Sequence, residues 1–248
     1  MVRALLIRGM LAGVLAGVLA FAFAWLFGEP QVDLAIGFEE HMHKMAGESP
    51  EPELVSRSVQ STIGLLTGVV VYGAAIGGIF ALTFAYVYGR IGRLGPRGMA
   101  GLLALAGFVA LIVVPQIKYP ANPPAIGEPD TIGTRTALYF AMMALSVIAA
   151  VTAASTGRQL ARRLGEWNSA LIAIAAYLAV VAAAMAMLPP VNEVPDGFSA
   201  VTLWNFRVAS LGMQAVLWVT LGLAFGLFAH YRLSPAHRVE NRAARSLR

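Results

Sequence analysis

Residues 134–163 read TRTALYFAMMALSVIAAVTAASTGRQLARR, and this stretch decides the fold class. It has no charged residue from Thr136 to Gly157, and a basic cluster follows directly. An apolar run of about 20 residues is long enough to cross the hydrocarbon core of a bilayer as an α-helix. Because Lys and Arg are retained on the cytoplasmic side during insertion, the cluster marks the inner end of the span. The stretch therefore predicts a transmembrane helix.

The same pattern recurs along the rest of the chain. Apolar runs predict six spans, near residues 9–27, 62–88, 98–117, 134–156, 168–188 and 205–230. Eleven of the thirteen acidic residues lie in every second connecting segment, and thirteen of the eighteen basic residues lie in the other segments and near the two ends. The positive-inside rule then places both termini in the cytoplasm. We predict an all-α integral membrane protein, with residues 1–232 as one transmembrane domain and residues 233–248 as a basic cytoplasmic tail.

Composition and missing motifs exclude several classes of protein. Of the 248 residues, 58% are hydrophobic and 12% are charged, whereas soluble domains average about 45–50% and about 25%. The chain has no cysteine, which excludes disulfides, thiolate metal ligands and cysteine nucleophiles. The net charge of +5 lies in short clusters beside apolar runs, which indicates topology and lipid contact rather than nucleic-acid binding. Because the sequence has no phosphate-binding glycine loop, nucleophile elbow or two-histidine zinc helix, we do not expect an enzyme.

Glycines in the first two spans predict close contacts between helices. Gly9, Gly13 and Gly17 recur at four-residue spacing and therefore lie on one face of a helix. The second span repeats this spacing in two pairs, Gly64 with Gly68 and Gly73 with Gly77. A signal peptide is the alternative interpretation of the first span, because basic residues precede it and residues 22–24 (AFA) could form a cleavage site. The glycine face favours a retained helix.

The outer segment 28–61, predicted to be a long acidic loop, carries the densest chemistry. Residues 38–45 read FEEHMHKM, and imidazole, carboxylate and thioether groups are ligands for divalent metals of intermediate softness. In a helix, Glu39 and His43 would lie one turn apart, as would His41 and Met45. In an extended segment, His41 and His43 would instead point to the same side. We expect capture of a divalent metal ion by Glu39, Glu40, His41 and His43, with Met45, Asp33 and Glu29 as secondary ligands. The alternative is a solvated charged loop without a metal.

Two further outer loops are rich in proline, and an expected ion path runs beneath them. Proline fixes φ and donates no backbone hydrogen bond, so residues 119–124 (YPANPP) and 188–191 (LPPV) should be stiff. Four charged residues near these loops are expected to line the path: Asp130, Arg135, Asp196 and Arg207. No ionisable residue lies near the middle of a span, which disfavours a carrier with a buried charged site. The polar groups within the spans, Ser146 and Gln214 among them, are expected to form hydrogen bonds between helices.

Several short motifs give the chain a resemblance to a known family. They are the Glu29-Pro30 and Glu39-Glu40 pairs, residues 88–90 (YGR), 96–97 (PR), 107–110 (GFVA), 118–124 (KYPANPP) and 129–135 (PDTIGTR). On these residues the chain resembles the CbtA family of predicted cobalt transporter subunits over nearly its whole length. The resemblance implies five or six membrane spans, a role in cobalt uptake for cobalamin biosynthesis, and a small single-span partner, CbtB, with a histidine-rich motif. It supplies no ligand residues, so the metal-site prediction rests on the chain's own segment 28–61.

These observations lead to one expected function and two alternatives. We expect a transporter subunit in the cytoplasmic membrane that takes up a divalent metal ion, with Co²⁺ first and other divalent metals open. Membrane lipids and further copies of the chain are candidate partners. A non-transporting scaffold that docks a partner through its outer loops fits the glycine-lined helices nearly as well. A membrane lipid enzyme that uses Arg135 or Arg207 fits less well, because the acidic and basic groups are scattered along the sequence.

Overall fold

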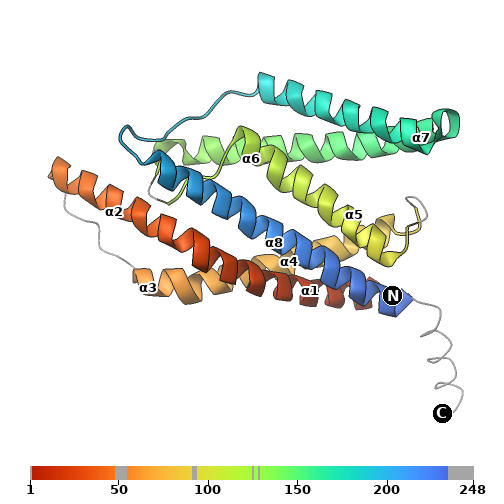
Figure 1. Ribbon diagram of the computed structural model, residues 1–248, viewed down its shortest axis with the longest axis horizontal. Coiled ribbons are helices and arrows are strands. Elements are labelled where there is room, and N and C mark those ends of the chain that lie inside the picture. The colour runs from red at the N-terminus through yellow and green to blue at the C-terminus, as the bar shows by residue number, and fades with distance from the viewer. Residues whose placement is uncertain (1, 48–54, 91–93, 125, 128, 234–248) are drawn as a thin grey trace, which may run out of the picture. The chain divides into compact units, whose positions relative to one another are not determined.

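The computed structural model describes residues 2–47, 55–90, 94–124, 126–127 and 129–233. Every regular element in these ranges is a helix (Figure 1). The elements are α1 (Val2–Phe23), η1 (Ala24–Gly28), α2 (Glu29–Ala46), α3 (Arg57–Val59), η2 (Gln60–Gly64), α4 (Leu65–Val87), α5 (Pro96–Phe108), η3 (Val109–Val113), α6 (Val114–Lys118), η4 (Pro129–Thr131), α7 (Ile132–Met187) and α8 (Ala200–Leu233). The predicted all-α fold class is confirmed. The predicted basic tail lies outside the described residues from residue 234 onward.

The described elements join into five helices that are long and apolar enough to cross a membrane. They are Val2–Ala46, Arg57–Val87, Pro96–Lys118, Ile132–Met187 and Ala200–Leu233. Two of the six predicted spans, near 134–156 and 168–188, lie together in the 56-residue helix α7. The backbone of α7 leaves the helical conformation at Gly165, with φ 78° and ψ 164°, and its two halves fold back along each other in Figure 1. The number of crossings and the side of the termini remain predictions.

The prediction of a loop at 28–61 is wrong for most of the segment. The first helix continues through the π-helical turn η1 into α2, which ends only at Ala46. In η1 the Glu29 amide donates to the Ala24 carbonyl, five residues back, and this wider turn precedes Pro30, which has no N–H to donate. Glu, Gln, Ala, Leu, Met and Lys have good helix propensity. Charge and a proline in the segment therefore coexist with a continuous helix.

One compact unit comprises the described parts of Met1–Pro30, Glu51–Leu105 and Gly212–Arg248. Within it α1 and α4 pack through glycines, because a Cβ added at Gly13 would lie 2.0 Å from the Gly73 carbonyl oxygen. A Cβ at Gly77 would likewise lie 2.1 Å from the Gly9 carbonyl oxygen. Only glycine permits such a close approach of two helix backbones. The predicted glycine face of the first span is confirmed, and α1 is an integral part of this unit.

The other predicted glycine pair in this unit makes no such contact. A Cβ at Gly68 would meet nothing within 4 Å, and one at Gly64 would meet only the Val59 backbone of its own segment. Spacing alone therefore did not distinguish the packed pair from the unpacked one. The packing continues with aromatic rings, since the ring centroids of Phe80 and Phe84 lie 5.3 and 5.0 Å from that of Phe225.

The second compact unit comprises the described parts of Gln31–Pro50 and Ala106–Leu211. Its largest element is the α7 hairpin, whose halves are joined by a 2.9 Å hydrogen bond between the Ser146 and Tyr177 hydroxyls. Met142 and Val181 are buried in the same cluster, one from each half of the hairpin. The expectation that Ser146 bonds between helices is confirmed. The hairpin and the segments that lead into and out of it build the site described below.

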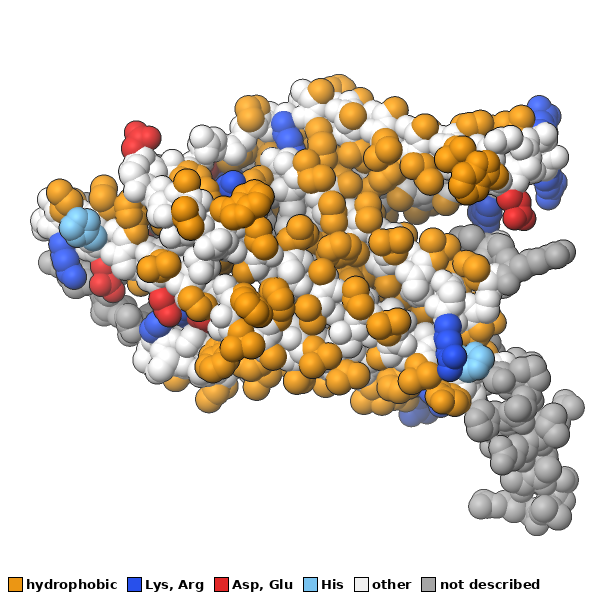
Figure 2. Space-filling view, viewed as in Figure 1, with side chains coloured by type: hydrophobic (Ala, Val, Ile, Leu, Met, Phe, Trp, Pro, Cys, Tyr) orange, Lys and Arg blue, Asp and Glu red, His pale blue; other side chains and the backbone are white. Residues whose placement is uncertain are grey.

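The surface of the molecule is that of a protein surrounded by lipid. Figure 2 shows hydrophobic side chains over much of the visible face, with charged side chains sparse among them. In the most apolar window of α7 only 6% of the residues are buried inside the chain, against 33–39% in the other four long helices. Burial within the chain does not cover these apolar faces. Five such helices make this a multi-pass membrane protein.

Candidate functional site

A cavity of about 780 Å³ lies within the second unit. Its walls are the proline-rich segment 119–124 after α6, the beginning of α7, and the segment 191–194 before α8. Four charged side chains line it, Glu39 from α2, Arg135 from α7, Glu193 from the segment before α8, and Arg207 from α8. Pockets for small molecules have volumes of about 300–1,000 Å³. The cavity is therefore the candidate functional site.

A buried tyrosine joins the two proline-rich segments beside this cavity. The Tyr119 hydroxyl donates to the Pro189 carbonyl at 2.9 Å, and the residue is 8% exposed. Burial raises the pKa of the Tyr119 phenol above its ordinary value, so the hydroxyl remains a donor at any physiological pH. This bond fixes one proline-rich segment against the other. The predicted stiffness of these loops thus rests on a specific contact as well as on proline itself.

One ion pair crosses the cavity wall. Arg135 Nη1 lies 3.0 Å from Glu193 Oε2, and the Thr131 hydroxyl donates to Glu193 Oε1 at 2.6 Å. Gly127, at φ 132°, makes room for this guanidinium, because an added Cβ would lie 2.5 Å from Arg135 Nη1. The sequence singled out Arg135, whereas it gave Glu193 no role beyond its place in an acidic outer loop. Arg135 and Glu193 are far apart in the sequence and meet only in the folded chain, so no local sequence pattern predicts their contact.

Arg207 has a different set of partners. Its Nε donates to the Ala121 carbonyl at 3.2 Å, and its Nη2 donates to the Asn122 side-chain oxygen at 2.9 Å. Both acceptors are neutral, and no carboxylate in the described part of the chain lies within ion-pair distance of this guanidinium. The contacts hold the beginning of α8 against the proline-rich wall. They leave the positive charge of Arg207 uncompensated by an ion pair.

Of the seven predicted metal ligands, Glu39 alone lines the cavity. It lies on α2, which Phe38 anchors in this unit by an edge contact with Phe198, the ring centroids being 5.2 Å apart. His43 follows one helical turn later, as predicted for a helix, and is half-buried. The other predicted ligands within residues 38–45 point away from the cavity, because neighbouring positions on a helix differ in direction by about 100°. α2 therefore presents only part of the motif to the cavity.

Four of the other predicted metal ligands lie on the surface. His41, Met45 and Asp33 are exposed, and Glu40 pairs with Lys44 at 3.8 Å on an exposed turn of α2. Of the four predicted path residues, Arg135 and Arg207 line the cavity. Asp130 and Asp196 are exposed and are not part of its lining.

The comparison with known proteins supplies the family. A family model described as "Probable cobalt transporter subunit (CbtA)" matches residues 2–230. The chain belongs to the CbtA family. No curated protein and no solved structure shows significant similarity to it. The family description is that of a transporter subunit, a role that is not enzymatic and that implies partner subunits.

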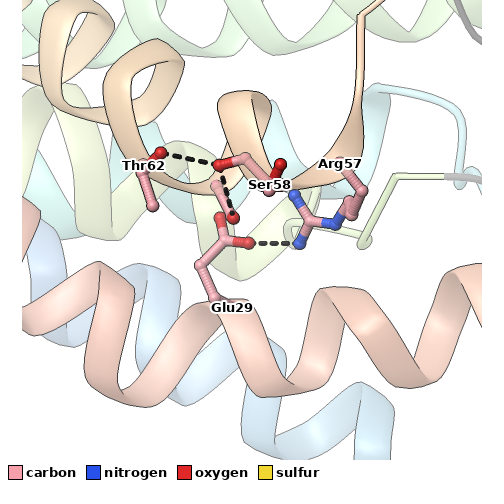
Figure 3. Close-up of polar contacts among 5 residues, drawn as sticks. Glu29, Arg57, Ser58 and Thr62 are labelled. Atoms are coloured by element: carbon pink, nitrogen blue, oxygen red, sulfur yellow. Dashed lines mark hydrogen bonds and ion pairs between the residues drawn. The ribbon is translucent and has the colours of Figure 1, made fainter.

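Glu29 of this CbtA chain has a partner of its own in the first unit. Its carboxylate forms an ion pair with the Arg57 guanidinium, and the two side chains are 14% and 26% exposed. Figure 3 shows the pair beside the start of the second long helix, where the Thr62 hydroxyl donates to the Ser58 carbonyl at 2.6 Å. The ion pair ties the end of η1 to α3. Glu29 therefore has a stabilising role in the fold, whatever it adds to the negative potential of the segment.

The described residues of the CbtA chain contain no group of three His, Asp or Glu side chains that could together hold a metal ion. Glu39 and His43 share one face of α2, while the remaining predicted ligands are distributed around the helix or belong to the first unit. A metal centre with three such side chains is thus not built in this part of the chain. The charged groups of the cavity are instead the Glu39 carboxylate, the Arg207 guanidinium and the Arg135–Glu193 ion pair.

Proposed function

We propose that this chain is the membrane-embedded subunit of an uptake system for a divalent metal ion, with Co²⁺ as the first cargo. The observation that carries the proposal is the family match over residues 2–230. The geometry of the cavity supports it, because the acidic segment found in the sequence reaches the cavity through Glu39. In this proposal the metal is the cargo, and the chain holds it only in passing.

The proposed capture begins on α2. The 45-residue helix Val2–Ala46 is about 68 Å long at 1.5 Å per residue, whereas the hydrocarbon core is about 30 Å thick. The C-terminal part of the helix therefore extends beyond the core. Exposed Asp33 would add negative potential there, whereas Glu40 and Glu29 are paired with Lys44 and Arg57. Exposed His41 and Met45 would offer nitrogen and sulfur donors to a passing ion. Glu39, with His43 one turn away, would pass the ion to the cavity.

The proposed route then follows the cavity between its proline-rich wall and the α7 hairpin. Asp130 and Asp196 would add negative potential near its mouth, while Arg135 stays neutralised by Glu193. No phosphate-binding loop occurs in the sequence, so energy must come from the membrane potential, an ion gradient or a partner subunit. The potential alone favours inward movement by about 2.3 kcal/mol per charge per 100 mV, and a dication carries two charges.

The proposed setting is the cytoplasmic membrane, with both termini inside. The partner implied by the family description would be a small single-span, histidine-rich subunit of the CbtB kind. Such a partner would supply the imidazole nitrogen ligands that the described residues do not gather in one place.

The direct test is the metal content of cells. The chain is expressed in a cobalt-poor host with and without a small histidine-rich partner, and Co, Ni, Zn, Mn and Cu are measured by mass spectrometry. We expect selective accumulation of cobalt. Unchanged content of every metal in both strains, with the chain confirmed in the membrane, would contradict the proposal.

A second candidate function is favoured by one observation. The apolar window of α7 is only 6% buried within the chain, so this hairpin offers a large surface to a partner helix. A scaffold that docks a partner without moving metal would use that surface. The cell measurement separates the two functions, because a scaffold binds its partner and leaves the cobalt content unchanged.

A further inference from the structure

We propose that the cargo reaches the cavity of the second unit as a complex of a divalent metal ion with a small carboxylate chelator. This inference rests on the proposed function and names the form in which its cargo binds. Arg207 binds a carboxylate of the chelator, and Glu39 faces the metal side of the complex.

The cavity supplies too few ligands to coordinate a divalent metal ion by itself. A borderline divalent metal in a protein site usually takes several nitrogen, oxygen or sulfur ligands. In the described part of the chain no three His, Asp or Glu side chains come together, and the cavity lining contains two carboxylates, of which Glu193 is held by Arg135 and Thr131. Glu39 is then the lining carboxylate outside that cluster. A chelator that brings its own donor atoms completes the coordination.

The guanidinium of Arg207 is suited to bind a carboxylate of the chelator. A guanidinium has five N–H groups in a planar fork that matches a carboxylate. The two bonds to Ala121 and Asn122 use one N–H of Nε and one of Nη2 and orient the fork, but both acceptors are neutral. A positive charge on a cavity wall repels a bare dication. The same charge attracts the carboxylate of a metal complex.

The cavity is larger than a single hydrated metal ion needs. Water occupies about 30 Å³ per molecule in the liquid, so the first hydration shell of a six-coordinate ion needs about 180 Å³. The cavity of about 780 Å³ is several times larger. Its walls of proline, isoleucine and tyrosine also resemble a small-molecule pocket more than a tight cage for one ion.

The test measures binding to the full chain in lipid nanodiscs by calorimetry. The probes are Co²⁺ as its chloride, the Co²⁺–citrate complex, and citrate alone. The variants are Arg207→Gln and, as a matched control, Arg162→Gln, an exposed arginine of α7 that does not line the cavity. We expect the wild type to bind Co²⁺–citrate about tenfold or more tightly than Co²⁺ alone, as for one charge-assisted hydrogen-bonded contact.

In Arg207→Gln that preference should disappear, while Arg162→Gln should keep it. Arg207→Lys, which keeps the charge and loses the fork, should retain part of it and serves as the test if the Gln variant does not fold. Equal affinity for Co²⁺ and Co²⁺–citrate would overturn the inference. So would citrate alone binding as tightly as the complex, or an unchanged preference in both Arg207 variants.

The same probes given to cells separate this inference from the proposed function. Cobalt accumulation that is equal from the chloride and from the citrate complex would overturn the inference and keep the proposed function. Accumulation from neither form would overturn both. Faster accumulation from the complex, lost in Arg207→Gln and kept in Arg162→Gln, is the expected result.

Discussion

The two arginines of the cavity face different partners, and this difference determines what each can do. Arg135 is neutralised by Glu193 at 3.0 Å and fixes two segments of the wall. Among the described residues, Arg207 donates to two neutral oxygens, at 3.2 and 2.9 Å, and its charge is left for the proposed ligand. Both were expected near an ion path from sequence alone. Their division of roles depends on Glu193 and Asn122, which no local pattern in the sequence indicates.

Replacing Glu193 with Gln should destabilise the cavity wall. The substitution removes the charge that Arg135 faces and leaves a weaker acceptor for Thr131, and Glu193 is only 10% exposed. We expect a cost of about 1–3 kcal/mol, measured as a lower melting temperature in detergent. The control is Glu40→Gln, whose exposed pair with Lys44 at 3.8 Å should contribute about 0–1 kcal/mol. Equal losses in the two variants would contradict the assigned role of Glu193.

Tyr119→Phe should lower stability by about 1 kcal/mol at neutral pH, because it removes the hydrogen bond to Pro189. It should also change the response to alkaline pH. Burial raises the folded-state pKa of Tyr119 above 10.0, so above that pH the unfolded chain releases a proton that the folded chain retains, and stability falls as the pH rises. Thermal unfolding from pH 8 to 11 should show a smaller alkaline loss in the variant. Parallel pH profiles would argue against a buried, bonded phenol.

At the scale of elements, periodic patterns in the sequence predicted a helix face that packs, whereas the ends of the helices could not be predicted from the sequence. The glycine spacing of the first span predicted its contact face because close backbone approach needs glycine at each turn of the interface. The same spacing at Gly64 and Gly68 led to a wrong expectation, since spacing does not reveal which face meets a neighbour. Residues 28–61 were expected to form an outer loop because they are acidic and lie between two apolar runs, although a helix was considered for residues 39–45. The π-helical turn before Pro30 has no sequence signature that would have corrected this.

Gly13→Ala should separate α1 from α4. Its Cβ would lie 2.0 Å from the Gly73 carbonyl oxygen, which is backbone and cannot rotate away. We expect a loss of about 1–3 kcal/mol from overpacking, seen as a lower melting temperature. Gly68→Ala is the control, because its Cβ would meet nothing within 4 Å and alanine favours a helix over glycine by about 1 kcal/mol. A loss of the same size in both variants would exclude the glycine contact as its cause.

Gly165→Ala should destabilise the turn of the α7 hairpin. At φ 78° and ψ 164° the backbone is in a region that is essentially restricted to glycine. The expected cost is about 1–3 kcal/mol, again measured by thermal unfolding. Gly133→Ala, near the start of the same helix and with open space around an added Cβ, should be neutral or stabilising. If Gly165→Ala stabilised the protein as well, α7 would be one uninterrupted helix.

At the scale of the whole molecule, the sequence predicts the class of protein well and the site poorly. Apolar runs and the segregation of charge predict a multi-pass helical membrane protein because the bilayer imposes length and polarity on each span. The cavity combines residues from α2, the segment after α6, α7 and α8. Such a combination depends on tertiary packing, so only Glu39, Arg135 and Arg207 of its charged residues were anticipated.

The central claim is that Glu39 in the cavity captures the metal that this membrane subunit takes up. The measurement that tests it most directly is cellular cobalt at limiting supply, in strains with equal membrane levels of wild type, Glu39→Gln and Glu40→Gln. Glu39 lines the cavity and Glu40, its neighbour, lies on the exposed side of α2. We expect accumulation in the wild type, a several-fold loss in Glu39→Gln and near wild-type accumulation in Glu40→Gln. Equal accumulation in all three strains would contradict it.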